Sequence, residues 1–188
     1  MNNTQLSKSE LRELKSTKEI FNSTKRHPIY VILDSLKCAH NIWTILRLSD
    51  AMLVEKVFIC GDTITPPNWK IKTSSRGAER WVPWEFRENI VDVIQELRDQ
   101  GVYIVSSEIS KKSQCYDTVE YKFPIWIIFW REDEGVSGVA LNASDVVVHL
   151  PIYWMCNSIN VSTASSVLMY EIHRHIQWTD IQVTSKMH

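Results

Sequence analysis

The stretch Leu150-Pro-Ile-Tyr-Trp-Met-Cys-Asn-Ser-Ile-Asn-Val-Ser-Thr-Ala-Ser-Ser166 joins the end of an apolar strand to the start of a helix. Apolar residues then recur at helical spacing at Val161, Ala164, Val167, Leu168, Ile172 and Ile176. The polar segment with Ser158 and Asn160 is therefore expected at a helix N-terminus, where backbone N–H groups lack partners and can bind a ligand. Two interpretations stay open, because the segment is either a binding loop or a helix entrance capped by Asn160 or Ser162.

Buried strands and amphipathic helices alternate along the rest of the chain. Short apolar runs predict strands at residues 29–33, 57–60, 102–105, 125–129 and 146–150. Helical spacing predicts helices at residues 41–53 and 90–97, with a short helical piece near Val139. Strands that are apolar throughout and separated by helices favour an α/β fold, with a mostly parallel sheet and helices on both faces.

Length and composition set the domain organisation. The chain has 188 residues, 44% hydrophobic and 23% charged, which suits one domain with a single sizeable core. We expect this domain at residues 28–177. A basic helical extension is expected at residues 1–27, opened by a capping box of Ser7 and Glu10, and a tail at residues 178–188. The basic extension is either a solvated helix face or a contact to phosphates.

Cysteine spacing and hydropathy bear on the compartment. The four cysteines are widely spaced and contain no Cys-x-x-Cys pair, which argues against a disulfide framework and against a metal site. There is no apolar signal segment at the N-terminus and no apolar run of membrane-spanning length. We therefore expect a cytoplasmic protein with no metal and no membrane partner.

Three polar loops follow apolar strands, at residues 106–108, at residues 130–135, and in the segment that ends with Ser158-Ile-Asn160. Ligands of parallel α/β sheets bind beyond the carboxyl ends of the strands, so these loops are expected to converge on one site. Glu132 and Glu134 could act there as acid and base, although solvated loop carboxylates are the alternative. Arg47, on a largely apolar helix, is either a surface charge or an anion ligand.

Three of these segments together resemble a known family. The runs Asn41-Ile-Trp-Thr-Ile-Leu-Arg47-Leu-Ser-Asp50, Trp130-Arg-Glu132-Asp-Glu-Gly135-Val-Ser137 and Leu150 to Ala164 are similar, in this order, to the three motifs of the SpoU/TrmH-type RNA 2′-O-ribose methyltransferases. The resemblance implies a SPOUT fold, in which the C-terminal segment threads a loop to form a deep trefoil knot. It also implies a homodimer that acts on tRNA or rRNA and holds S-adenosylmethionine in the knot.

The resemblance assigns roles by position. The implied catalytic residues are Arg47, Asn41, Glu132, Ser158 and Asn160. The implied cofactor-binding residues, many of which act through their backbone, are Ser107, Trp130, Leu150, Ile152, Ser158 and Ile159. Because arginine stays protonated in proteins, Arg47 is an awkward base, and binding of the RNA phosphate is the alternative role. No segment remains for a separate RNA-recognition domain, which favours tRNA over rRNA.

Each motif departs from the family at one position. Trp43, Trp130 and Trp154 stand where the family usually has glycine. Glycine allows close approach of the backbone, whereas tryptophan fills a much larger volume. The alternative function is therefore a non-catalytic RNA-binding dimer, in which Trp130 and Trp154 occlude the cofactor pocket.

Overall fold

The computed structural model describes residues 5–13, 18–66, 80–130, 135–153 and 155–176. The chain divides into two compact units, one formed by residues 1–26 with 177–188 and the other by residues 27–176. Three residues singled out from the sequence, Glu132, Glu134 and Trp154, lie outside the described residues. None of the described helices is both long and apolar enough to cross a bilayer.

The N-terminal unit begins with the expected capping box. The backbone N–H of Ser7 donates to Glu10 Oε2 at 2.7 Å, and the backbone N–H of Glu10 donates to Ser7 Oγ at 3.3 Å. Two short helices are described here, α1 (Lys8–Glu13) and α2 (Lys18–Ser23), where the sequence predicted one helix. The capping-box prediction is confirmed.

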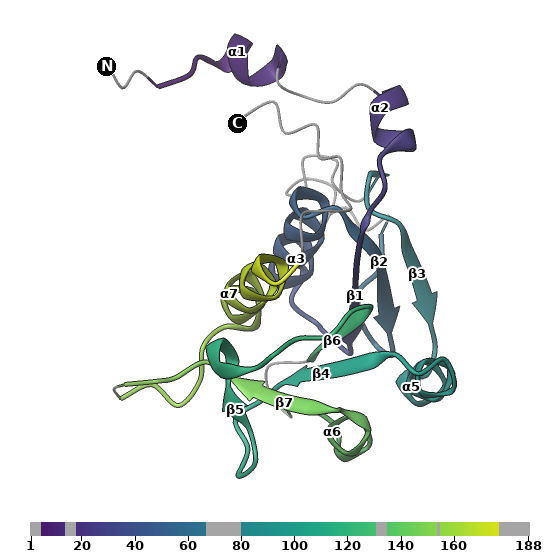
Figure 1. The fold of residues 1–188 in the computed structure, drawn as a ribbon, viewed down its shortest axis with the longest axis vertical. Coiled ribbons are helices and arrows are strands. Elements are labelled where there is room, and N and C mark those ends of the chain that lie inside the picture. The colour runs from purple at the N-terminus through teal and green to yellow at the C-terminus, as the bar shows by residue number, and fades with distance from the viewer. Residues whose placement is uncertain (1–4, 14–17, 67–79, 131–134, 154, 177–188) are drawn as a thin grey trace. The chain divides into compact units, whose positions relative to one another are not determined.

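The second unit is built on a seven-stranded sheet, in the order β3-β2-β1-β6-β4-β7-β5 (Figure 1). The strands are β1 (His27–Asp34), β2 (Val54–Cys60), β3 (Trp84–Arg87), β4 (Tyr103–Ser107), β5 (Gln114–Cys115), β6 (Ile125–Trp130) and β7 (Val146–His149). Every pairing between neighbouring strands is parallel. The central strands β1, β4 and β6 are buried along most of their length, as their apolar runs predicted.

Helices cover both faces of this sheet (Figure 1). The pair α3 (Ala39–Ala51) and α7 (Val161–Arg174) packs on one face, and the pair α5 (Ile90–Asp99) and α6 (Gly138–Ala143) on the other. A short 3-10 helix, η2 (Tyr116–Thr118), follows β5. The predicted α/β class, with a mostly parallel sheet and helices on both faces, is confirmed.

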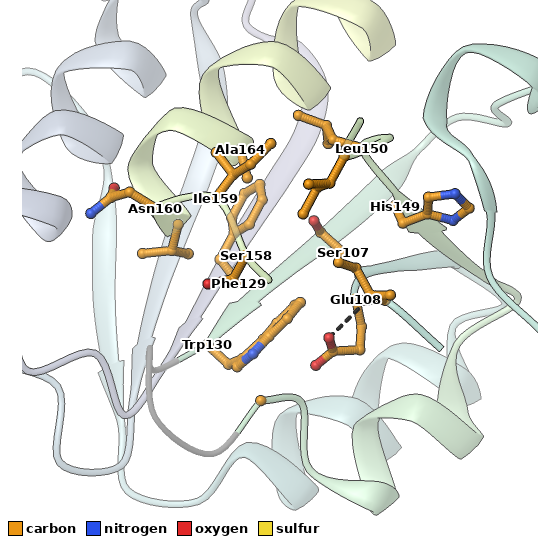
Figure 2. Close-up of a pocket in the computed structure, with 14 residues that line it drawn as sticks. Ser107, Glu108, Phe129, Trp130, His149, Leu150, Ser158, Ile159, Asn160 and Ala164 are labelled. Atoms are coloured by element: carbon orange, nitrogen blue, oxygen red, sulfur yellow. Dashed lines mark hydrogen bonds between the residues drawn. The ribbon is translucent and has the colours of Figure 1, made fainter. Parts of the chain in front are cut away.

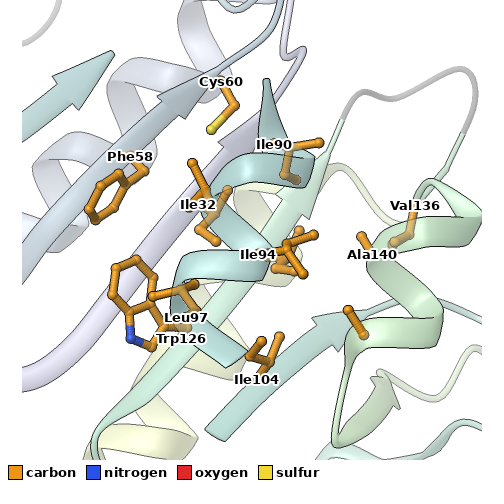
Figure 3. Packing of buried hydrophobic residues seen from close by; sticks show 13 residues of the cluster. Ile32, Phe58, Cys60, Ile90, Ile94, Leu97, Ile104, Trp126, Val136 and Ala140 are labelled. Atoms are coloured by element: carbon orange, nitrogen blue, oxygen red, sulfur yellow. The ribbon is translucent and has the colours of Figure 1, made fainter. Parts of the chain in front are cut away.

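The core under α5 and α6 shows why these helices form where they do. Ile94 and Leu97 lie on the buried stripe of α5 and pack against Ile32, Ile104 and Trp126 of the sheet (Figure 3). Asn89 caps the helix, because its side chain accepts a hydrogen bond from Val91 N at 2.9 Å. The apolar stripe and the cap together fix the start and the buried face of α5.

The edge strands β3 and β5 were not predicted from the sequence. Both are short and half-exposed, so neither contains the continuous apolar run that marks a buried strand. In β3 the side chain of Glu85 forms ion pairs with Lys56 of β2 and with Arg87, both at 2.5 Å, so the edge strand carries charged side chains. The threading of the C-terminal segment into a knot stays a prediction.

Candidate functional site

A cavity of about 380 Å³ lies where the strands β4, β6 and β7 end and α7 begins (Figure 2). Its volume falls in the range of about 300–1,000 Å³ that is usual for small-molecule sites. It is lined by Ser107, Glu108 and Ile109 at and after β4; Phe129, Trp130 and Gly135 at and after β6; His149, Leu150, Ile152, Ser158 and Ile159 at and after β7; and Asn160, Val161 and Ala164 at α7. The three polar loops therefore converge on one site, as the sequence predicted.

The register of the strands explains this convergence. Ser106 of β4 pairs with Ile128 of β6, and Ser107 pairs with Val148 of β7, so the three strands end at nearly the same level. The backbone N–H of Glu108 continues the ladder by donating to the carbonyl of Val148 at 2.8 Å. Because all three strands run in the same direction, the residues that follow them meet at one edge of the sheet.

Asn160 connects the cavity to the helix that follows it. Its side-chain Oδ1 accepts hydrogen bonds from Ser162 N at 2.9 Å and from Ser162 Oγ at 2.7 Å, and α7 starts at the next residue. Asn160 is therefore the N-cap of α7, and it also lines the cavity. The two interpretations that the sequence left open for this segment apply to the same residue.

Glu108 ties the end of β4 to the segment after β6. Its carboxylate accepts hydrogen bonds from Ile109 N at 2.7 Å and from Val136 N at 3.1 Å. Next to it, Gly135 has φ +69°, and a Cβ at this position would lie 2.6 Å from Glu108 Oε2. Only glycine adopts this backbone conformation without strain and leaves room for the carboxylate.

The structure brings the predicted cofactor-binding residues together but leaves the predicted arginine elsewhere. All six of those residues line the cavity, as does Asn160. Asn41 and Arg47 lie on α3 and do not line it. Asn41 is buried in the first turn of α3, and Arg47 is exposed, with its guanidinium carbon 5.6 Å from the centre of the Trp43 ring.

Trp130 forms part of the cavity wall without closing the cavity. It is half-buried, and its ring packs against the core cluster under α5 and α6. The replacement of a family glycine by this tryptophan therefore changes the wall and leaves a volume of small-molecule size.

Two polar residues of the cavity received no role from the sequence. Glu108 stands in one of the predicted polar loops, but its hydrogen bond to Val136 spans 28 residues and left no local signal. His149 also lines the cavity, and its Nδ1 lies 3.0 Å from Ser113 Oγ, in the segment before β5. Within the described part of the chain, no group of three or more His, Cys, Asp or Glu side chains could hold a metal ion.

A profile of the SpoU rRNA Methylase family matches residues 28–170, which cover most of the sheet unit and the entire cavity wall. The chain belongs to this family. Among its relatives, a protein of Staphylococcus saprophyticus named for the TrmH family of tRNA/rRNA methyltransferases is 31% identical over 144 residues, and one of Staphylococcus epidermidis with the same name is 30% identical over 149 residues. These alignments cover 77% and 79% of this SpoU chain. The SpoU chain spans 57% and 59% of the length of these two relatives.

Solved structures of the family share the fold of this SpoU chain. The crystal structure of the A. aeolicus TrmH/SpoU tRNA modifying enzyme has a TM-score of 0.74 at 28% identity, and covers 89% of this chain and 82% of its own. The AdoMet-bound rRNA methyltransferase from Sinorhizobium meliloti has a TM-score of 0.75 at 23% identity, with 82% and 59% covered. The parallel sheet and its flanking helices are therefore the fold of SpoU methyltransferases.

Proposed function

We propose that this protein transfers a methyl group from S-adenosylmethionine to a ribose 2′-hydroxyl of structured RNA, with tRNA favoured over rRNA. The observation that supports this most is the cavity. Its wall combines residues of the second and third family motifs, which are far apart in the sequence, and its volume suits a small molecule. The match to the SpoU family supports the reaction class.

The residues of the cavity fit this cofactor. Phe129, Leu150 and Ile159 offer apolar surface for an adenosine group, Ser107 and Ser158 offer hydroxyl groups, and Glu108 offers a carboxylate for a cation. The cofactor supplies the activated methyl group, and the protein supplies orientation and electrostatics. The AdoMet-bound relative with the same fold lends further support.

Arg47 completes the site from a second copy of the chain in our proposal. No lysine or arginine is among the described residues that line the cavity, while Arg47 is exposed on α3. A homodimer that uses the surface of α3 would bring this guanidinium to the cavity of its partner. Asn41, buried in the first turn of the same helix, would position α3 for this contact.

The chain's own residues then act mainly by positioning. Arg47 binds a phosphate next to the target ribose and stabilises the developing alkoxide, since a protonated guanidinium cannot accept the proton. Ser158, Asn160 and Glu132 are the proposed polar partners that align the 2′-hydroxyl, and the Glu132 carboxylate accepts the hydroxyl proton as the methyl group leaves the sulfur. Alignment of two reacting groups lowers the barrier by replacing a bimolecular encounter with a unimolecular step.

RNA contacts beyond the cavity are assigned to basic segments. Residues 1–27 carry several lysines and arginines, and residues 174–188 add further basic and histidine side chains. A cytoplasmic location is part of the same proposal, because the substrate is a cellular RNA. The alternative of a non-catalytic RNA-binding dimer requires that Trp130 and Trp154 occlude the pocket. Trp130 lines the cavity without filling it, and Trp154 lies outside the described residues.

Two measurements test the proposed function. Calorimetric titration with S-adenosylmethionine is expected to give saturable binding at one site per chain. In a tritiated-methyl assay with tRNA and rRNA, Arg47→Ala is expected to abolish methylation while leaving cofactor affinity nearly unchanged. Arg98→Ala, which removes an exposed arginine from α5, serves as the matched control and should keep full activity. Absence of cofactor binding, or full turnover by Arg47→Ala, would refute the proposal.

A further inference from the structure

A row of three side chains runs along one side of α3. His40, Trp43 and Arg47 follow one another at spacings of three and four residues, which place side chains one above the other on a helix. The rings of His40 and Trp43 have their centroids 5.5 Å apart, and the guanidinium carbon of Arg47 lies over the Trp43 ring, 5.6 Å from its centre. Trp43 is therefore in contact with both other members of the row.

The contact between Trp43 and Arg47 is a cation–π contact. A guanidinium within about 6 Å of a ring centre is attracted by the face of the ring, and tryptophan attracts it most strongly. Among the residues that the structure describes, no carboxylate pairs with Arg47 and no group accepts a hydrogen bond from it. Because an aromatic face accepts no conventional hydrogen bond, the N–H donors of Arg47 stay available for a phosphate oxygen.

The indole of Trp43 is itself anchored in the protein. The side chain is half-buried, and its Nε1 is fully buried without an acceptor among the described residues. A buried N–H that lacks an acceptor lowers the stability of the folded state, and a phenylalanine would present a ring without this cost. The packing of α3 therefore does not explain a tryptophan here, whereas the contact with Arg47 does.

The ring reduces the entropy that Arg47 loses on binding. An exposed arginine samples many rotamers, and it loses this freedom when its guanidinium is fixed against a phosphate. A side chain that already rests on a ring has fewer conformations to lose, so binding costs less. A glycine, which the family motif usually has at position 43, could not restrict Arg47 in this way.

We propose that Trp43 is a positioning residue that holds the Arg47 guanidinium ready for an RNA phosphate. This inference rests on the proposed function, in which Arg47 binds a phosphate next to the target ribose, and it names the side chain that orients this arginine. The contact lies within one chain. It therefore forms in the same way whichever subunit's cavity the arginine serves.

Filter binding of unfractionated tRNA to the full chain, at one fixed salt concentration, tests the proposal because it needs no turnover. Trp43→Leu removes the ring and should raise the RNA dissociation constant by about two- to fivefold, as expected for loss of an exposed cation–π contact. Trp43→Phe keeps an aromatic face and should raise this constant by less than about twofold. In an Arg47→Ala background, Trp43→Leu should have no further effect, because the ring then has no guanidinium to hold.

Phe86→Leu is the matched control, since it removes an aromatic ring that is 47% exposed on β3 and should leave the RNA dissociation constant unchanged. Should Trp43→Leu fail to fold in a thermal melt, Trp43→Met takes its place, because methionine also lacks a ring and adapts its packing more easily. An unchanged dissociation constant in the ringless variant, or an equal increase with and without Arg47, overturns the positioning role. The proposed function then stands if the unmodified chain methylates tRNA in the tritiated-methyl assay, and absence of methylation overturns both.

Discussion

Replacement of Gly135 by alanine tests the geometry that fixes Glu108. Gly135 has φ +69°, and a Cβ there would lie 2.6 Å from Glu108 Oε2. The left-handed backbone costs a non-glycine residue about 1–2 kcal/mol. Displacement of the carboxylate from Val136 N costs about 1.5–3 kcal/mol more, the usual range for a hydrogen bond to a charged group. The free energy of unfolding should therefore fall by roughly 2.5–5 kcal/mol in Gly135→Ala.

A double-mutant cycle separates the two contributions. In a Glu108→Ala background the clash is absent, so Gly135→Ala should cost only the backbone share of about 1–2 kcal/mol. Gly101→Ala is the matched control, because Gly101 has φ +65° and nothing lies within 4 Å of an added Cβ. Urea denaturation monitored by circular dichroism measures all of these variants. Equal costs of Gly135→Ala with and without Glu108 would refute the reasoning.

Three further predictions concern stability at acid pH, the core and the dimer. Burial, and to a lesser degree the nearby His173, lowers the pKa of His27 to about 4. The folded state therefore favours neutral His27, and the free energy of unfolding should decrease as the pH falls from 6.5 toward 4. Urea midpoints at pH 7 and pH 4.5 should differ less for His27→Phe than for the unmodified chain, and an identical difference would contradict this. Leu97 is 2% exposed, so Leu97→Ala should lower the free energy of unfolding by about 2–5 kcal/mol in urea denaturation. Val91 lies on the same helix but is 42% exposed, so Val91→Ala should change this free energy by less than about 0.5 kcal/mol. Ala164→Phe fills the cavity, so neither Arg47→Ala nor Ala164→Phe alone should methylate RNA. If Arg47 acts across a two-fold dimer, co-expression of the two variants should restore activity to about a quarter of the catalytic sites. No recovery of activity would place the arginine in the site of its own subunit.

Sequence reasoning recovered those parts of the fold that local patterns encode. The runs at β1, β6 and α5 were predicted within a few residues, because a buried strand and an amphipathic helix each leave a periodic signal. The edge strand β3 was not predicted, because it is held by pairing with β2 and by the ion pair between Glu85 and Lys56, whose partners lie far apart in the chain. Long-range partners of this kind leave no pattern in a single sequence.

The candidate site was predictable to a similar extent. Residues such as Ser107, Leu150 and Ser158 were assigned through the resemblance, and the structure brings them into one cavity, although their roles stay predictions. Glu108 had no predicted role, because its importance arises from Gly135 and Val136 across the cavity wall. For Arg47 the reverse holds. The resemblance assigned it a catalytic role, but it lies on α3 and does not line the cavity of its own chain.

The order of strands in the sheet has a consequence for biosynthesis. The centre of the sheet pairs β1 with β6, so Ile29 lies beside Ile125 although nearly one hundred residues separate them. Contacts between such distant segments slow folding, because a long loop must close before they form. A nascent chain that has emerged from the ribosome only as far as β4 would still expose one side of β1. Its apolar edge would then be open to chaperones and to aggregation until β6 is synthesised.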